Sequence, residues 1–197
     1  MSNNILVKDN FFNSVDELRE LALSFKFMPR KQVPWDIKGG WRGYRTGELS
    51  YYDIPLLNEC VENILKTTSD FFNLTDYDFI RFFHITYEKD MKNQIAKWHK
   101  DESVYAGVLY LTPDPPKETG TTIFHDGERI EVENKYNRLI AYHGNWKHGP
   151  TNFFGDTHDN ARLTMTFFMN PSDIMRASRI SEQHQYDLYD KFCRSNS

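Results

Sequence analysis

His99 and Asp101 stand two positions apart in "AKWHKDESVYAGVLYL", residues 96 to 111. Because side chains alternate along an extended strand, both would project to the same side and reach one point. An imidazole and a carboxylate are suitable ligands for a divalent cation, but one of each holds it weakly. A tripeptide of this kind also arises by chance. The pair therefore indicates a metal site only if a third ligand joins it.

Two candidates for that third ligand, His143 and His148, lie in "AYHGNWKHGP". Two imidazoles and one carboxylate on one face of an octahedral ion leave three coordination positions open. Non-haem Fe(II) oxygenases use this arrangement for a co-substrate and oxygen. The residue types predict that kind of site, and spacing alone leaves the choice between the two histidines open.

A predominantly β fold is expected to position these residues. Turn clusters such as "TPDPP" and "HDGE" separate short runs of strand-forming residues between positions 78 and 169. The six runs are "DFIRFFHITY", "SVYAGVLYL", "TGTTIF", "RIEVE", "NRLIAY" and "ARLTMTFFM". They predict an antiparallel sandwich or barrel, most simply a jelly roll, also called a double-stranded β-helix.

Two helices are predicted before these strands. Ser14 and Glu17 form the S-x-x-E pattern of a helix N-terminus, which predicts a helix over 15–26. Pro55 suits a first helical position, and the apolar residues after it recur at three and four residues, which predicts a helix over 55–70. The fold class is therefore mainly β with flanking helices (α+β), a jelly roll braced by N-terminal helices.

One domain is expected from 197 residues of which 39% are apolar. It divides into an N-terminal helical and loop region at 1–77, a jelly-roll core at 78–170 and a C-terminal helical tail at 171–197. Cys60 and Cys193 have neither metal-type spacing nor the density of a disulfide scaffold, which favours reduced thiols in a cytoplasmic protein. No stretch of 18 apolar residues or secretory signal is visible. Membrane association is not expected.

The net charge also bears on partners. At −4, without a long basic run, it argues against nonspecific phosphate binding and makes nucleic acid an unlikely partner, although a specific nucleic-acid substrate stays open. A small molecule or a peptide is the expected partner. The oligomeric state cannot be read from these features.

The order of the motifs resembles the Fe(II)- and 2-oxoglutarate-dependent oxygenases, particularly their prolyl-4-hydroxylase-like branch. The matching elements are a Y-x11-H-x-D segment, "LYLTPDPPKETGTTIF", "NRLIAYHGNWKHGPTNF" and "ARLTMTFFM", which together cover residues 78 to 169. The family's Gly-x-Thr-x-Phe-like segment corresponds to Gly120, Thr122 and Phe124. One departure is that "TPDPPKETG" has a single glycine where many relatives have two.

The resemblance implies roles for individual residues. His99, Asp101 and His148 would hold Fe(II), and His148 is favoured over His143 because it precedes "GPTNF" and lies 162 minus 148, or 14, residues before Arg162. 2-Oxoglutarate and O₂ would be co-substrates, with succinate, CO₂ and a hydroxylated product released. The prime substrate is expected to be peptidyl proline or a small metabolite.

The far carboxylate of 2-oxoglutarate needs its own partner. A planar guanidinium binds a carboxylate through two hydrogen bonds, which makes Arg162 the expected anchor, with Thr164 on the same strand face. Tyr87 occupies the place of a tyrosine that contacts this carboxylate in the family, but it also reads as a core aromatic residue.

The stretch 39–52, with Trp41, Arg42 and Tyr44, could form a substrate wall through stacking and cation–π contacts. It could equally pack the N-terminal helices onto the sheet. Two functions from other classes remain open: a jelly-roll or cupin-like binding module, and a metal-dependent isomerase that does not turn over 2-oxoglutarate.

Overall fold

The computed structural model describes residues 4–29, 42–75, 77–90 and 98–171. The tail predicted over 171–197 lies outside these ranges except for Pro171, which ends a strand. Trp41, in the stretch 39–52, also lies outside them.

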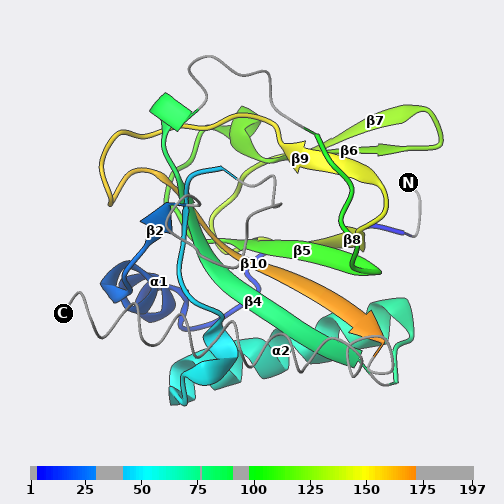
Figure 1. Ribbon diagram of the computed structural model, residues 1–197, viewed down its shortest axis with the longest axis horizontal. Helices are drawn as coiled ribbons and strands as arrows, with labels where there is room; N and C mark the ends of the chain where they lie inside the picture. Colours follow the sequence, from blue (N-terminus) through cyan, green and yellow to red (C-terminus); the bar gives the residue numbers. More distant parts are fainter. Residues whose placement is uncertain (1–3, 30–41, 76, 91–97, 172–197) are drawn as a thin grey trace.

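Two antiparallel sheets form the centre of the described part of the chain (Figure 1). The larger sheet contains, in spatial order, β1 (Leu6–Lys8), β8 (Leu139–His143), β5 (Tyr105–Tyr110), β10 (Arg162–Pro171), β4 (Tyr77–Thr86), β3 (Tyr44–Arg45) and β2 (Met28–Pro29). The smaller sheet contains β7 (Glu128–Val132), β6 (Thr121–His125) and β9 (Lys147–Pro150). The six predicted runs correspond to β4, β5, β6, β7, β8 and β10, whereas β1, β2, β3 and β9 were not predicted.

The alternation of side chains along β10 separates the two faces of the larger sheet. Leu163, Met165 and Phe167 point to the face that is packed against the helices. Arg162 and Phe168, at alternate positions, point to the face that the smaller sheet covers, where they line a cavity. The larger sheet thus separates an apolar core from the space between the sheets.

The helices α1 (Val15–Ser24) and α2 (Pro55–Phe72) lie on the same side of the larger sheet, away from β6, β7 and β9 (Figure 1). Both predicted helices are therefore confirmed. Leu18 of α1 and Leu57 and Ile64 of α2 are fully buried in the same apolar cluster as the sheet residues. Short 3₁₀ helices in the described connections are η2 (Leu49–Tyr51), η3 (Glu88–Asp90) and η4 (Lys117–Thr119).

The predicted side-chain cap of α1 is absent. Ser14 is the residue before the helix, but its side chain makes no capping hydrogen bond. Its backbone has φ −97° and ψ 45°, which is not the extended conformation that aims a serine hydroxyl at the first free N–H groups. The helix start therefore depends on packing rather than on the predicted cap.

Cys60 lies on the buried face of α2 as a free thiol. Burial raises the pKa of this thiol to about 12. Because the thiolate is the reactive form, Cys60 is inert at neutral pH. None of the helices in the described residues has the length and apolar character needed to cross a bilayer.

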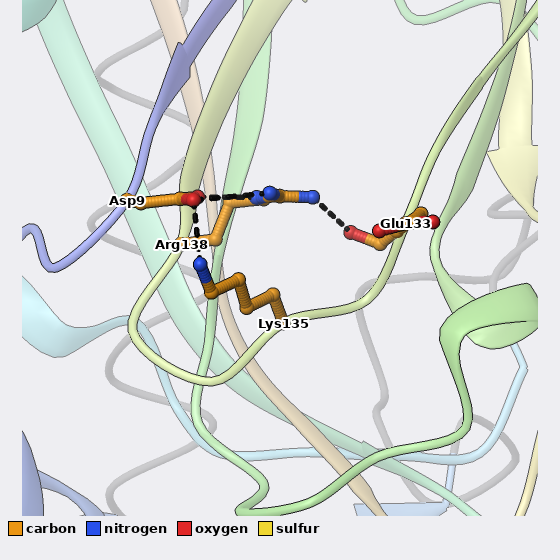
Figure 2. A network of polar contacts seen from close by, with 4 residues as sticks. All are labelled: Asp9, Glu133, Lys135 and Arg138. Carbon is orange, nitrogen blue, oxygen red and sulfur yellow. Dashed lines mark hydrogen bonds and ion pairs between the residues drawn. The ribbon is translucent and has the colours of Figure 1, made fainter.

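A polar network ties the N-terminal segment to the turn before β8 (Figure 2). Asp9 follows β1 and accepts hydrogen bonds from Arg138 Nε at 2.6 Å and Lys135 Nζ at 2.7 Å. Arg138 also donates to the Glu133 backbone carbonyl at 3.1 Å. The network fastens β1 to the edge of the sheet next to β8.

We expect Asp9→Asn to lower the free energy of unfolding at pH 7, and the difference from wild type to shrink toward pH 3. Hydrogen bonds from Arg138 and Lys135 lower the pKa of Asp9 from 3.8 to about 2. Because the pKa of Asp9 is lower in the folded than in the unfolded state, the ionised carboxylate stabilises the fold fully above about pH 4. This contribution is lost as the pH falls toward 2 and the carboxylate is protonated. Because the Asp9 side chain is 35% exposed, solvent screening limits the effect to below about 1 kcal/mol. Urea unfolding at both pH values measures it, and a difference independent of pH would contradict it.

Candidate metal centre

Two separate segments bring His99, Asp101 and His148 together. Asp101 Oδ1 lies 3.3 Å from His99 Nε2, and Asp101 Oδ2 lies 3.1 Å from His148 Nε2. One ligand atom from each of the three residues lies within 4.8 Å of the other two. No other group of this kind occurs among the described residues. The arrangement has the donor types and the closeness needed to hold one divalent cation.

Backbone hydrogen bonds create this convergence. His99 and His148 exchange two N–H···O bonds of 2.8 Å, so they are directly opposite each other in an antiparallel bridge. Their rings consequently lie on one side, with centroids 4.7 Å apart. Asp101 N–H donates to the Gly144 carbonyl at 2.8 Å. The predicted strand around His99 is reduced to this single bridge, yet it still places His99 and Asp101 at one point.

His148 has a fixed ring orientation. Its Nδ1 is 2.8 Å from the Trp146 backbone carbonyl, which can only accept, so Nδ1 carries the proton. The Nε2 atom is then the one presented to Asp101 and to a cation, as is usual when a second hydrogen bond orients a ligating histidine. The residue is 4% exposed, whereas the His99 side chain is 44% exposed. One ligand is thus held in the interior and the other lies at the opening.

The electrostatic environment keeps Asp101 ionised. Burial works against the charged carboxylate, but the close contacts with the imidazoles of His148 and His99 outweigh it and hold the pKa of Asp101 well below its usual range. Tyr142 packs its ring 4.7 Å from that of His148. Burial, together with the nearby Asp101 charge, raises the pKa of Tyr142 well above 10, so its phenol is neutral.

His143 is not part of the group. It ends β8, and its ring packs against Tyr105 and Trp146 at centroid distances of 4.8 Å. Burial, and then the nearby His125, lower its pKa. Between the two candidates, the structure therefore brings His148 and not His143 to the His99–Asp101 pair.

Arg162 lines the same cavity as the three candidate ligands, at the first position of β10. It is buried, and its Nε donates to the Thr119 carbonyl at 3.0 Å while one terminal nitrogen donates to the Gly120 carbonyl at 3.4 Å. The guanidinium carbon lies 5.5 Å from the ring centroid of Tyr110. Burial lowers the pKa of Arg162, but a guanidinium remains protonated in proteins. The cavity thus contains a fixed cation as well as a candidate metal centre.

We expect Gly120→Ala to destabilise the fold by about 1–3 kcal/mol, the usual cost of overpacking. A Cβ at this position would lie 1.8 Å from the Val132 carbonyl oxygen and 2.7 Å from the Asn134 backbone nitrogen, so backbone must move. The movement displaces the carbonyl that holds Arg162. Thermal unfolding of the variant and of the wild type measures the loss. A Gly120→Ala protein as stable as the wild type would contradict the prediction.

Two residues that were expected to join Arg162 at the co-substrate do not line the cavity. Thr164 is buried on the correct face, but it does not line the cavity, and its hydroxyl lies 3.2 Å from that of Thr166. Tyr87 follows Thr86, which faces the cavity, so alternation turns Tyr87 to the other face. There its ring packs against Tyr44, at 5.5 Å. The expected contact of Tyr87 with the co-substrate is therefore not supported, and the core-aromatic interpretation fits better.

The described part of the stretch 39–52 contributes side chains to both faces of the sheet, and its role as a substrate wall stays a prediction. Arg42 lines the cavity, whereas Tyr44 packs on the helical side of the sheet. Trp41 lies outside the described residues. Arg45, in the same stretch, lines the cavity from β3 and pairs in register with His84. The opposite directions of Tyr44 and Arg45 follow from β3, which is too short to be recognised as a strand from the sequence.

Two further residues, His84 and Tyr142, line the cavity. The Nε2 atom of His84 contacts the Arg42 carbonyl. Burial first, and then the charge of Arg45, lower the pKa of His84 well below 6.5, so this imidazole is neutral at pH 7. The cavity as a whole has a volume of about 90 Å³ and also includes apolar residues such as Val108, Phe153 and Phe168.

Comparison with solved structures identifies the fold. A prolyl-4-hydroxylase from Pseudomonas putida matches with a TM-score of 0.59 and 15% identity, over 85% of this chain and 92% of that one. A 2OG-Fe(II) oxygenase family protein from Burkholderia pseudomallei has a TM-score of 0.60 and 11% identity, over 85% and 84% of the two chains. HygX from Streptomyces hygroscopicus, with nickel, 2-oxoglutarate and hygromycin B bound, has a TM-score of 0.60 and 11% identity, over 85% and 83%.

The predicted fold is confirmed by these matches. The chain has the jelly-roll fold of the 2-oxoglutarate and Fe(II) oxygenases, in agreement with the resemblance found in the sequence. No protein-family model matches the chain, and no curated protein matches it.

Proposed function

We propose that the chain is a non-haem Fe(II)- and 2-oxoglutarate-dependent dioxygenase that hydroxylates a C–H bond of its prime substrate. The observation that carries this proposal is that His99, Asp101 and His148 open into the cavity that buried Arg162 also lines. A metal site without an opposing cation would suit many other functions. Among reactions that need both a metal centre and an opposing cation, the fold shared with 2-oxoglutarate oxygenases favours this one.

The donor set fits Fe(II). Two imidazole nitrogens and one carboxylate are the ligands of the facial triad, which leaves coordination positions open. In the described part of the chain, no fourth His, Cys, Asp or Glu joins the group. The open positions distinguish it from a structural zinc site, where four protein ligands close the sphere. When bound, iron supplies the activation of O₂ coupled to oxidative decarboxylation of 2-oxoglutarate to succinate and CO₂.

The chain itself binds and orients the co-substrate. Arg162 would bind the far carboxylate, since its charge is buried and its position is fixed by two backbone carbonyls. Thr121 lines the cavity beside it, and its hydroxyl is 2.7 Å from that of Tyr110. The neutral phenol of Tyr142 also lines the cavity, with its ring 4.7 Å from that of His148. Apolar walls around these groups exclude water, which strengthens each polar contact.

The test is turnover of 2-oxoglutarate by purified protein with Fe(II) and O₂, with succinate measured by proton NMR. We expect slow succinate formation without any added prime substrate, and none without Fe(II). Protein that binds Fe(II) but forms no succinate and shows no 2-oxoglutarate binding would support a metal-dependent isomerase or a binding module instead. Protein that binds neither would contradict the proposal outright.

A further inference from the structure

Thr86 is a residue of the cavity wall whose polar group makes no hydrogen bond within the fold. It is the last residue of β4, it lines the cavity, and it is 1% exposed. Its hydroxyl has no hydrogen-bond partner among the described residues. A buried hydroxyl in this state has lost its bonds to water without replacing them, which costs stability. The group is therefore suited to bind a ligand that enters the cavity.

Strand pairing places Thr86 beside Arg162. The two residues are directly opposite each other in the antiparallel pair of β4 and β10. Side chains at opposed positions project to the same face of a sheet, with Cβ atoms about 4.5–5.5 Å apart. Both side chains line the cavity. A cation from one strand and an unpartnered hydroxyl from its neighbour thus begin at the same end of the cavity.

Gly43 fixes the direction of the Thr86 side chain. A Cβ added at Gly43 would lie 2.6 Å from the methyl carbon of Thr86 and 3.1 Å from its Cα, so the methyl group packs directly against the glycine backbone. The side chain of threonine adopts staggered χ1 angles, and the position of its methyl group also sets the position of its hydroxyl. The hydroxyl is therefore held in one place before any ligand binds.

Other threonine hydroxyls near this end of the cavity have partners in the protein. The hydroxyl of Thr164 lies 3.2 Å from that of Thr166. The hydroxyl of Thr121 lies 2.7 Å from that of Tyr110. Among these threonines, Thr86 alone has a hydroxyl without a partner in the described part of the chain.

A carboxylate bound to Arg162 can use this hydroxyl as well. Arg162 donates from Nε and one terminal nitrogen to the carbonyls of Thr119 and Gly120, and a guanidinium has five N–H donors, so donors remain for a ligand. A carboxylate has two oxygens with about four acceptor positions in total, more than one edge of a guanidinium fills. A hydroxyl that donates to such an oxygen makes a charge-assisted hydrogen bond, which is stronger than one between neutral groups.

We propose that Thr86 is a specificity residue for the co-substrate, and that its hydroxyl donates a hydrogen bond to the far carboxylate of 2-oxoglutarate beside Arg162. This inference rests on the function proposed above and deepens it, because two strands then recognise one carboxylate. Thr86 takes the role that the sequence suggested for Thr164 and Tyr87, which do not line the cavity. A keto acid without the far carboxylate leaves both groups without a ligand and is rejected for that reason.

The test measures binding of 2-oxoglutarate by isothermal titration calorimetry to protein loaded with Ni(II), so that no turnover occurs. Thr86→Val keeps nearly the same shape but removes the hydroxyl. We expect it to weaken 2-oxoglutarate binding about tenfold or more, as is usual for loss of a hydrogen bond to a charged group. Thr86→Ser keeps the donor and loses only the methyl group that fixes it, so it should retain most of the affinity.

A second ligand shows which end of the co-substrate the hydroxyl contacts. 2-Oxobutyrate keeps the keto acid end that would chelate the metal but lacks the far carboxylate. We expect it to bind wild-type protein and Thr86→Val with equal affinity, and to bind both more weakly than wild-type protein binds 2-oxoglutarate. If Thr86→Val weakened 2-oxobutyrate as much as 2-oxoglutarate, the hydroxyl would not contact the far carboxylate, and the inference would be overturned.

Thermal unfolding without metal or co-substrate gives an independent readout. Because the Thr86 hydroxyl has no partner, Thr86→Val should be at least as stable as the wild type. Thr68→Val is the matched control, since Thr68 is fully buried on α2, donates to the Ile64 carbonyl at 2.7 Å and does not line the cavity. It should leave 2-oxoglutarate affinity unchanged without raising stability. A Thr86→Val protein less stable than the wild type would mean that the hydroxyl already has a partner in the fold, which contradicts the inference.

The outcomes separate this inference from the proposed function. If wild-type protein loaded with Ni(II) does not bind 2-oxoglutarate, the proposed function fails and the inference fails with it. If the wild type binds 2-oxoglutarate and Thr86→Val binds it equally tightly, only the inference is overturned. Weaker binding of 2-oxoglutarate by Thr86→Val, with unchanged binding of 2-oxobutyrate and undiminished stability, supports it.

Discussion

His148→Ala is expected to abolish tight Fe(II) binding, whereas His143→Ala should leave it unchanged. Loss of an outer hydrogen-bond partner of a metal ligand already costs about 10- to 100-fold in affinity, so loss of the ligand itself should cost more than about 100-fold. His148 contributes a buried Nε2 oriented by the Trp146 carbonyl, while His143 packs among aromatic rings away from the site. Anaerobic titration with Fe(II) measures both affinities.

The His143→Ala protein makes this comparison specific. Both substitutions remove one imidazole from neighbouring positions, so any general effect on folding or charge is shared. We expect His148→Ala to lose succinate formation together with Fe(II) binding, and its thermal unfolding without metal to resemble that of His143→Ala. Equal losses of Fe(II) affinity in the two variants would show that the site is not built as described.

Arg162→Met is expected to raise the concentration of 2-oxoglutarate needed for half-maximal turnover by about 10- to 150-fold, with Fe(II) affinity retained. This range follows from the 1.5–3 kcal/mol that hydrogen bonds to a charged group contribute. The variant removes the buried guanidinium but keeps an apolar chain of similar length against Tyr110. Steady-state succinate formation at saturating Fe(II) measures the change.

Arg162→Lys serves as the control for charge. Lysine keeps the positive charge but has no planar pair of donors, so its defect should lie between those of wild type and Arg162→Met. Because Arg162 also donates to the carbonyls of Thr119 and Gly120, thermal unfolding of each variant must accompany the kinetics. If Arg162→Met needed the same concentration of 2-oxoglutarate as the wild type, Arg162 would not be its anchor, and another cation of the cavity would have to bind the far carboxylate.

Local patterns predicted the elements that have strong local signals. The apolar spacing from Leu57 to Ile64 predicted α2, and the alternating strand runs predicted six of the strands. Elements with short or weak patterns were not predicted: β3 has two residues, and β9 contains Gly149 and Pro150. Such strands exist because neighbouring strands supply their hydrogen bonds, and a window of sequence does not contain those neighbours.

The predicted roles of two side chains, Tyr87 and Ser14, are not supported, and both residues lie at the end of a helix or strand. Tyr87 comes one position after the last residue of β4, and that single step turns it away from the cavity. Ser14 precedes α1 as predicted, yet its backbone is not in the extended conformation and its side chain makes no capping hydrogen bond. In both cases the residue type was suitable, and the local backbone decided whether the side chain could take the predicted role.

By itself, the sequence determined the chemical inventory of this protein: a His-x-Asp pair, later histidines, an arginine near the last strand, and the patterns of a jelly roll. Only the tertiary structure decided which members of this inventory meet. The bridge between His99 and His148 selected one histidine over the other, and the register of β3 with β4 turned Arg45 into the cavity. The physical reason is that ligands and charges act over a few ångströms, whereas these residues are far apart along the chain and approach only when the strands pair.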